Sequence, residues 1–199
     1  MLNNIEYSNS EIILLIIENI LKMLYKRNLI DFDNIKLYLS NINDKKNIFE
    51  FKIKNNKTIG VYLLNTSITT IVNGSPLDEY LSENITIPKI VIGKNVSKKV
   101  IRQLYQDYKN IEFFFEHDML IDLPSIIYIP EHKLLNEEEL NNLNLEKNLL
   151  KSIKLYDMIT RYYGGNIGDI FEVSRISENG YPPEYRRVVN SNIDLFFNN

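Results

Sequence analysis

The sequence contains no cysteine and only two histidines, His117 and His132. Without cysteine the chain can form no disulfide, no thiolate zinc site and no iron–sulfur cluster, and it has no cysteine nucleophile. No carboxylate–histidine spacing around either histidine indicates a zinc or iron site. We therefore expect no metal and no cofactor.

Long apolar runs are also absent. The longest run, Ile12–Ile17, ends at Glu18 and is far shorter than the roughly 20 residues that a membrane-spanning helix needs. Acidic rather than basic residues precede it, which is not the pattern of a secretory signal. We expect an intracellular protein with no membrane partner.

Positive charge is not in excess, because the formal net charge is -3. Such a chain has no overall electrostatic footprint for nucleic acid, although a local basic patch can still bind phosphate. Any contact with DNA should therefore be auxiliary. Hydrophobic residues make up 44% of the chain and charged residues 25%, which is typical of a folded globular protein.

The first 125 residues show the pattern of a mixed α/β domain. Ser10 is a candidate N-cap for a helix with apolar residues at helical spacing, and residues 33–39 form a second helical stretch. Residues 48–54 alternate apolar and charged side chains. Together with residues 58–64, which follow an Asn-rich turn, they predict a β-hairpin.

The rest of this domain alternates helices and strands. Ser75-Pro76 predicts the start of a helix that ends near residue 84, and residues 88–92 read as a buried strand. Ser97 is a natural N-cap for a helix with one apolar face, and residues 111–115 form another buried strand. The order of these elements predicts a mixed sheet with helices packed against it, over residues 1–125.

A second, smaller α+β domain is expected over residues 126–189. Asn136 caps a helix with Glu139 at the capping-box position. Asp157 caps a shorter helix that Gly164 ends. Residues 170–176 and 185–189 read as strands joined by a loop that contains Asn179-Gly180 and two prolines, and residues 190–199 are a tail. The overall fold class is α+β.

One alternative function is a magnesium-dependent nuclease. Glu50-Phe51-Lys52 on a strand is half of such a constellation, in which a second carboxylate holds the metal and the lysine orients water. Its second carboxylate could come from Asp31, Asp33 or Asp44. A half-exposed strand shows the same alternation, however, and Lys54 continues the charged face.

Three other short patterns carry a structural and a functional interpretation. The loop Gly164–Gly168 follows a helix and precedes a strand, which favours a helix end over a phosphate loop. His132 has no serine nucleophile in a recognisable elbow, so a structural hydrogen bond is favoured over general-base catalysis. Lys98 and Lys99 open a helix after Ser97, and a phosphate contact and a solvated helix start are equally compatible with this pattern.

Four blocks in order between Ile129 and Val188 resemble the C-terminal module of the fifth shared subunit of eukaryotic DNA-dependent RNA polymerases and of its small archaeal homologue. The family carries Val-Pro-x-His before a capped acidic helix, then Asp-Pro-Val-Ala-Arg-Tyr-x-Gly, then a glycine followed by Arg-x-Ser-Glu, and finally Tyr-Arg-x-Val. The matching residues are Ile129-Pro130-Glu131-His132 with Leu135–Glu139, Asp157–Gly164, Gly168 with Arg175, Ser177 and Glu178, and Tyr185–Val188. Met158 and Lys151 stand where the family has prolines.

The resemblance implies a non-catalytic polymerase subunit. Its C-terminal module would dock on the largest subunit, and residues 1–125, similar to the eukaryotic jaw domain with its nuclease-like topology but no active site, would lie beside downstream double-stranded DNA. The residues that match the DNA-approaching helix start are Asn95, Ser97, Lys98 and Lys99. The residues expected at the partner interface are Pro130, His132, Arg161, Tyr162, Tyr163, Arg175, Tyr185 and Arg186, with the aromatic and arginine side chains exposed.

The resemblance also bears on source and location. A jaw domain indicates a eukaryote or a large DNA virus. The heavy use of asparagine, isoleucine and lysine, which is typical of AT-rich coding, fits a virus at least as well as a eukaryote. We expect the nucleus for a cellular protein, or the virion and virus factory for a viral one. Transcription factors are possible further partners, and a free-standing interaction adaptor is a second alternative function.

Overall fold

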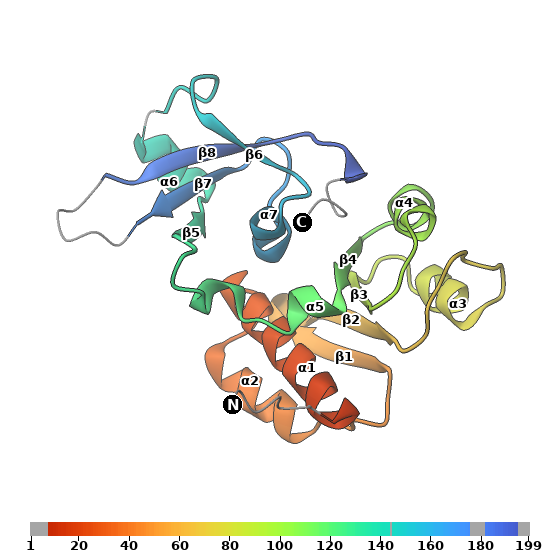
Figure 1. The fold of residues 1–199 in the computed structure, drawn as a ribbon. Helices are drawn as coiled ribbons and strands as arrows, with labels where there is room; N and C mark the ends of the chain where they lie inside the picture. The colour runs from red at the N-terminus through yellow and green to blue at the C-terminus, as the bar shows by residue number, and fades with distance from the viewer. Residues whose placement is uncertain (1–7, 144, 176–181, 195–199) are drawn as a thin grey trace, which may run out of the picture. The chain divides into compact units, whose positions relative to one another are not determined.

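The computed structural model describes residues 8–143, 145–175 and 182–194 (Figure 1). The chain divides between Ile121 and Asp122 into two compact units, the second of which begins slightly before the start that we predicted at residue 126. No helix in the described ranges is both long and apolar enough to cross a membrane.

The first unit is built on a four-stranded mixed sheet in the order β1-β2-β3-β4. Strands β1 (Ile48–Ile53) and β2 (Lys57–Leu64) form the predicted antiparallel hairpin around the short turn η1 (Lys54–Asn56). Strands β3 (Lys89–Gly93) and β4 (Ile111–Phe115) continue the sheet in parallel, so the sheet is mixed, as the order of the elements predicted. β3 is buried along its whole length, which is typical of a parallel strand covered on both faces.

Helices cover both faces of this sheet (Figure 1). α1 (Asn9–Lys26), α2 (Phe32–Ser40) and α5 (Glu116–Met119) pack together, and Arg27 at the end of α1 forms an ion pair of 2.6 Å with Glu112 of β4. α3 (Pro76–Ser82) and α4 (Lys98–Asp107) are crossovers between parallel strands. They lie together on the other face, as two crossovers of the same hand require when the strands follow in sequence order.

The first helix is capped by Ser8 and not by Ser10, so that detail of the sequence analysis is wrong. The Ser8 hydroxyl accepts a hydrogen bond of 3.3 Å from the Glu11 amide, and the Glu11 carboxylate accepts one of 2.7 Å from the Ser8 amide. This reciprocal pair is a capping box. The Ser-x-x-Glu spacing in residues 8–11 was the signal, and Ser10 falls inside the first helical turn.

The second unit also contains a four-stranded mixed sheet, in the order β5-β7-β8-β6. Its central antiparallel pair is β7 (Ile170–Ser174) and β8 (Glu184–Val189), which correspond to the two predicted strands. β5 (Glu131–Leu134) pairs antiparallel with β7. β6 (Lys151–Lys154) pairs parallel with β8. With helices α6 (Glu137–Leu143) and α7 (Met158–Tyr163), this unit is α+β as expected.

The caps predicted for the two helices are present. Asn136 and Glu139 accept from each other's backbone amides at 2.9 and 3.1 Å, and the Asp157 carboxylate accepts from the Ile159 amide at 2.9 Å. Gly164 ends α7 in the left-handed conformation with φ 70°. Such caps depend on residues within one helical turn, so sequence alone identifies them.

Edge strands β5 and β6 were not predicted. Each has four residues with charged side chains among them, so the apolar alternation is too short to recognise. Residues 126–130, which follow the 3₁₀ turn η2 (Leu123–Ser125), contain no strand. Residues 176–181 and 195–199 lie outside the described residues. The predictions for Ile176, Ser177, Glu178, Asn179-Gly180 and the end of the tail therefore lie outside them too.

Candidate functional surfaces

The residues predicted to approach DNA occupy the connection from β3 to α4 and the first turn of α4. Ser97 is the N-cap. Its hydroxyl accepts a hydrogen bond of 3.4 Å from the Val100 amide and donates one of 3.0 Å to the Thr69 carbonyl. Asn95, Lys98 and Lys99 are exposed. Two ammonium groups therefore lie at the positive end of the helix dipole, where a phosphate would meet favourable charge.

The loop 65–72 is tied to this helix start. The Ile68 amide donates to the Asn95 carbonyl at 2.9 Å, and the Ser97 amide donates back to the Ile68 carbonyl at 3.0 Å, which forms a parallel bridge between Ile68 and Val96. The loop also carries four exposed hydroxyl residues, Thr66, Ser67, Thr69 and Thr70. The sequence analysis assigned no role to this loop.

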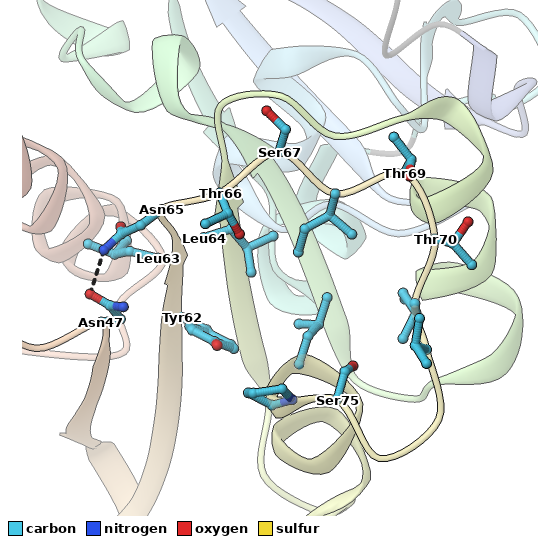
Figure 2. A pocket seen from close by; sticks show the side chains of 15 residues that line it. Asn47, Tyr62, Leu63, Leu64, Asn65, Thr66, Ser67, Thr69, Thr70 and Ser75 are labelled. Atoms are coloured by element: carbon cyan, nitrogen blue, oxygen red, sulfur yellow. Dashed lines mark hydrogen bonds between the residues drawn. The ribbon is translucent and has the colours of Figure 1, made fainter.

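A cavity of about 460 Å³ lies under the loop, between the end of β2 and the start of α3 (Figure 2). At its edge the Asn65 side-chain amide donates to the Asn47 side-chain oxygen at 2.8 Å. None of the side chains that line the cavity is charged. Its lining residues are Asn47, Tyr62–Val72 and Ser75–Leu77.

The nuclease alternative gains no support from the surroundings of Glu50 and Lys52. Both side chains are exposed and alternate with buried phenylalanines on edge strand β1. Asp31, one of the candidate second carboxylates, instead lies 3.0 Å from the ammonium of Lys54. In the described ranges no group of three or more acidic or histidine side chains could hold a metal ion.

The loop Gly164–Gly168 is a helix end, as predicted. The chain reverses at Gly164, and a Cβ on Gly165 would lie 3.1 Å from the ring of Phe171 and 3.2 Å from the Thr160 methyl group. The Asp169 carboxylate accepts from the Asn166 amide at 2.7 Å, which closes the turn. The glycines here permit a tight approach of backbone to a core ring.

Two of the predicted interface residues, His132 and Tyr163, belong to the core of the second unit. Their rings lie 6.2 and 5.9 Å from the ring of Phe171, in edge-to-face arrangements. His132 Nδ1 lies 2.7 Å from the Pro130 carbonyl oxygen, and burial lowers the pKa of His132. Burial raises the pKa of Tyr163 to about 12. With its lowered pKa, His132 is neutral at pH 7, and its hydrogen bond is structural, as the sequence analysis favoured.

Arg161 and Tyr162 are not exposed, which contradicts the prediction. Tyr162 is 2% exposed, its ring lies 5.2 Å from that of Tyr163, and Arg161 is 8% exposed. A six-residue helix has few side chains to bury, so its large aromatic rings contribute most of the apolar surface that it buries. Sequence spacing on so short a helix does not distinguish its inner from its outer face.

The other predicted interface residues remain accessible. Arg175 is exposed, and Pro130, Tyr185 and Arg186 are partly buried. Arg186 lies 3.1 Å from the carboxylate of Glu184, which Lys151 also approaches at 3.2 Å. The hydrogen bond from Arg186 lowers the pKa of Glu184. With the partly buried Tyr163, five of the eight predicted interface residues are therefore at least partly exposed.

Comparisons with known proteins match both units. The family profile described as RNA polymerase Rpb5, C-terminal domain, matches residues 121–189. "DNA-directed RNA polymerase subunit 5" of Acanthamoeba polyphaga mimivirus is 32% identical over 195 residues, which cover 92% of this chain and 94% of that protein. "DNA-directed RNA polymerase subunit Rpo5" of Methanosarcina barkeri is 32% identical over 65 residues, 31% of this chain and 83% of that protein. "DNA-directed RNA polymerases IV and V subunit 5B" of Arabidopsis thaliana is 24% identical over 62% of this chain and 59% of its own length.

Proposed function

Because this chain belongs to the subunit 5 family of DNA-directed RNA polymerases, we propose that its second unit docks on the largest polymerase subunit and its first unit lies beside downstream DNA. The chain is a non-catalytic subunit of a multisubunit DNA-directed RNA polymerase. The observation that carries this conclusion is the similarity to the mimivirus subunit over nearly the full length of both chains.

Docking through the second unit is supported by how the similarities are distributed. The family profile covers residues 121–189, which are almost the whole of the second unit. The archaeal relative is matched over 83% of its length by only 65 residues, so a protein of about one unit in size carries the name of a polymerase subunit. This distribution supports an assembly role for the small α+β module, and the accessible Pro130, Arg175, Tyr185 and Arg186 are its candidate contacts.

The first unit is proposed to be a jaw with nuclease-like topology and no active site of its own. Its DNA contacts would be Asn95, Ser97, Lys98 and Lys99. Exposure of the two lysines, together with the helix dipole behind them, supports a contact to phosphate that carries no sequence information. With a net charge of -3 on the whole chain, this contact would be an auxiliary one.

Synthesis of RNA is then the work of active-site residues in other chains of the complex. The protein would be located with that complex: in the nucleus for a cellular enzyme, or in the virion and the virus factory for a viral one. Transcription factors that bind near downstream DNA are further candidate partners.

Purification of the tagged protein under mild conditions from its native source tests the proposal. Mass spectrometry should find the two large polymerase subunits in amounts equal to this chain. Isolation of the chain alone, or with an unrelated complex, would contradict the docking proposal. In that case magnesium-dependent nuclease activity, with Glu50→Gln as the control, would be measured next.

A further inference from the structure

Helix α4 carries cations and an amide along one side, well beyond its first turn. Four exposed side chains share an arc of about 100° at 3.6 residues per turn: Lys98, Lys99, Arg102 and Gln106. We call them the donor face of α4. The opposite arc holds the buried Val100, Ile101 and Leu104, so packing of these residues on the first unit fixes the donor face toward solvent.

Carboxylates near α4 lie off the donor face, toward the two ends of the helix. Asp107, the last residue of α4, falls outside the arc. The Asp78 carboxylate of α3 accepts a hydrogen bond of 2.6 Å from the hydroxyl of Tyr108, so α3 meets α4 at its C-terminal end. Before the helix begins, Glu116 lies 3.6 Å from the ammonium of Lys94. Positive charge is therefore concentrated over the first two turns of α4, where three of the four donor-face side chains are cations.

The length of the donor face matches a run of phosphates better than a single anion. An α-helix rises 1.5 Å per residue, so Lys98 and Gln106 are about 12 Å apart along the axis. Phosphates of one DNA strand follow each other every 3.4 Å along the duplex, so this length spans about three of them. Arg102 lies one turn beyond Lys98, and a strand that reaches both side chains must run along the helix.

We propose that the downstream duplex runs along the donor face of α4, so that Arg102 and Gln106 contact phosphates beyond those at the helix start. The inference rests on the proposed function and deepens it, because that function places DNA only at the four residues from Asn95 to Lys99. A guanidinium can bind phosphate in bidentate fashion, and a side-chain amide donates a single hydrogen bond. Such contacts orient the duplex and read no sequence.

The absence of cysteine makes site-specific crosslinking a direct test. Lys98→Cys, Arg102→Cys and Gln106→Cys each give the chain one thiol, to which a photoactivatable crosslinker is attached before the subunit is assembled into the polymerase. Lys36→Cys is the control, because Lys36 is exposed on α2, which packs on the other face of the sheet. The labelled polymerase is bound to a downstream duplex, and the crosslinked nucleotides are mapped.

We expect DNA crosslinks from all three donor-face positions, with the crosslinked nucleotide moving in one direction from residue 98 to residue 106. The control should give none above background. Crosslinks from residue 98 alone, or from all three positions to one nucleotide, would overturn the inference and leave the proposed function intact. If residue 98 also gave none in fully assembled polymerase, the proposed DNA contact itself would fall.

The salt dependence of DNA binding provides a second measurement, without a crosslinker. Arg102→Gln in the assembled polymerase should lower the affinity for the downstream duplex and reduce the slope of log K against log salt by about 0.9, the value for one phosphate contact. Lys36→Gln removes one charge from another exposed helical position and should leave the slope unchanged. Both substitutions introduce a good helix former at an exposed site, so the fold is kept. An unchanged slope for Arg102→Gln would overturn the inference.

Discussion

The buried ammonium group of Lys89 donates a hydrogen bond of 3.0 Å to the carbonyl oxygen of Leu81. It also donates to the carbonyl of Glu83, the C-cap of α3, and it lies 5.2 Å from the centre of the Tyr80 ring. One lysine on β3 thereby satisfies two carbonyls at the end of α3, a position at which the helix dipole favours a cation.

Substitution Lys89→Met should lower the free energy of unfolding by about 1–3 kcal/mol, because the two helix-end carbonyls lose their donor while methionine keeps the volume. Denaturant unfolding measures the loss. Lys57→Met, at an exposed position of the same sheet, is the control and should change stability by less than about 0.5 kcal/mol. Equal losses in the two variants would contradict a specific contribution from the two hydrogen bonds of Lys89.

Gly60 on β2 is expected to tolerate no side chain, because a Cβ there would collide with the hydroxyl of Tyr80. Gly60→Ala should cost about 1–3 kcal/mol. Tyr80→Phe alone should be neutral or slightly stabilising, since the hydroxyl is buried without a hydrogen-bond partner among the described residues.

The double variant Gly60→Ala/Tyr80→Phe completes a mutant cycle. It should recover about 1 kcal/mol relative to Gly60→Ala, because the clashing oxygen is gone. Additive effects in urea denaturation would show that the two residues do not interact in this way.

His132 should make stability depend on pH below neutrality. Because burial lowers its pKa in the folded protein, the unfolded chain binds the proton more readily. The stability is therefore fully present above about pH 6.5, the ordinary histidine value, and is progressively lost as pH falls from there toward the lowered pKa.

Denaturation midpoints measured between pH 5 and 8 should decrease as the pH is lowered. The decrease should be steeper for the wild type than for His132→Gln. His117→Gln is the matched control, because that side chain is 71% exposed. If His132→Gln kept the wild-type slope, another group would have to be responsible.

Reversal of charge at the start of α4 should weaken binding of the polymerase to downstream DNA. For Lys98→Glu with Lys99→Glu we expect lower affinity and a salt dependence flattened by roughly one to two in the slope of log K against log salt, about 0.9 for each lost phosphate contact. Lys45→Glu with Lys46→Glu makes the same charge change at two other adjacent exposed lysines of the first unit. Should both pairs give the same slope, only net charge would be at work.

Truncation of Tyr162 should unfold the second unit rather than report on docking. At 2% exposure, Tyr162→Ala removes a buried ring and should cost about 3–5 kcal/mol. A thermal melt of the purified chain measures it. A small shift would show that the ring contributes little to the core, and only then would a loss of incorporation by this variant describe an interface.

Sequence reasoning was right where the chemistry is local. The N-caps at Ser97 and Asp157, the Asn136–Glu139 capping box and the turn at Gly164 each depend on residues within one turn of a helix. It missed the strands β5 and β6, which become strands only because β7 and β8 offer partners at the right register.

The sequence by itself therefore determined the family, through ordered blocks of residues, and most of the elements, through periodicity and capping. Only the tertiary structure decided which side chains face inward: Tyr162 went to the core and Tyr128 to the solvent, although both are tyrosines in the same unit. Burial results from contacts between residues far apart in the chain, and a short helix or turn carries too few residues to encode its inner face in its own pattern.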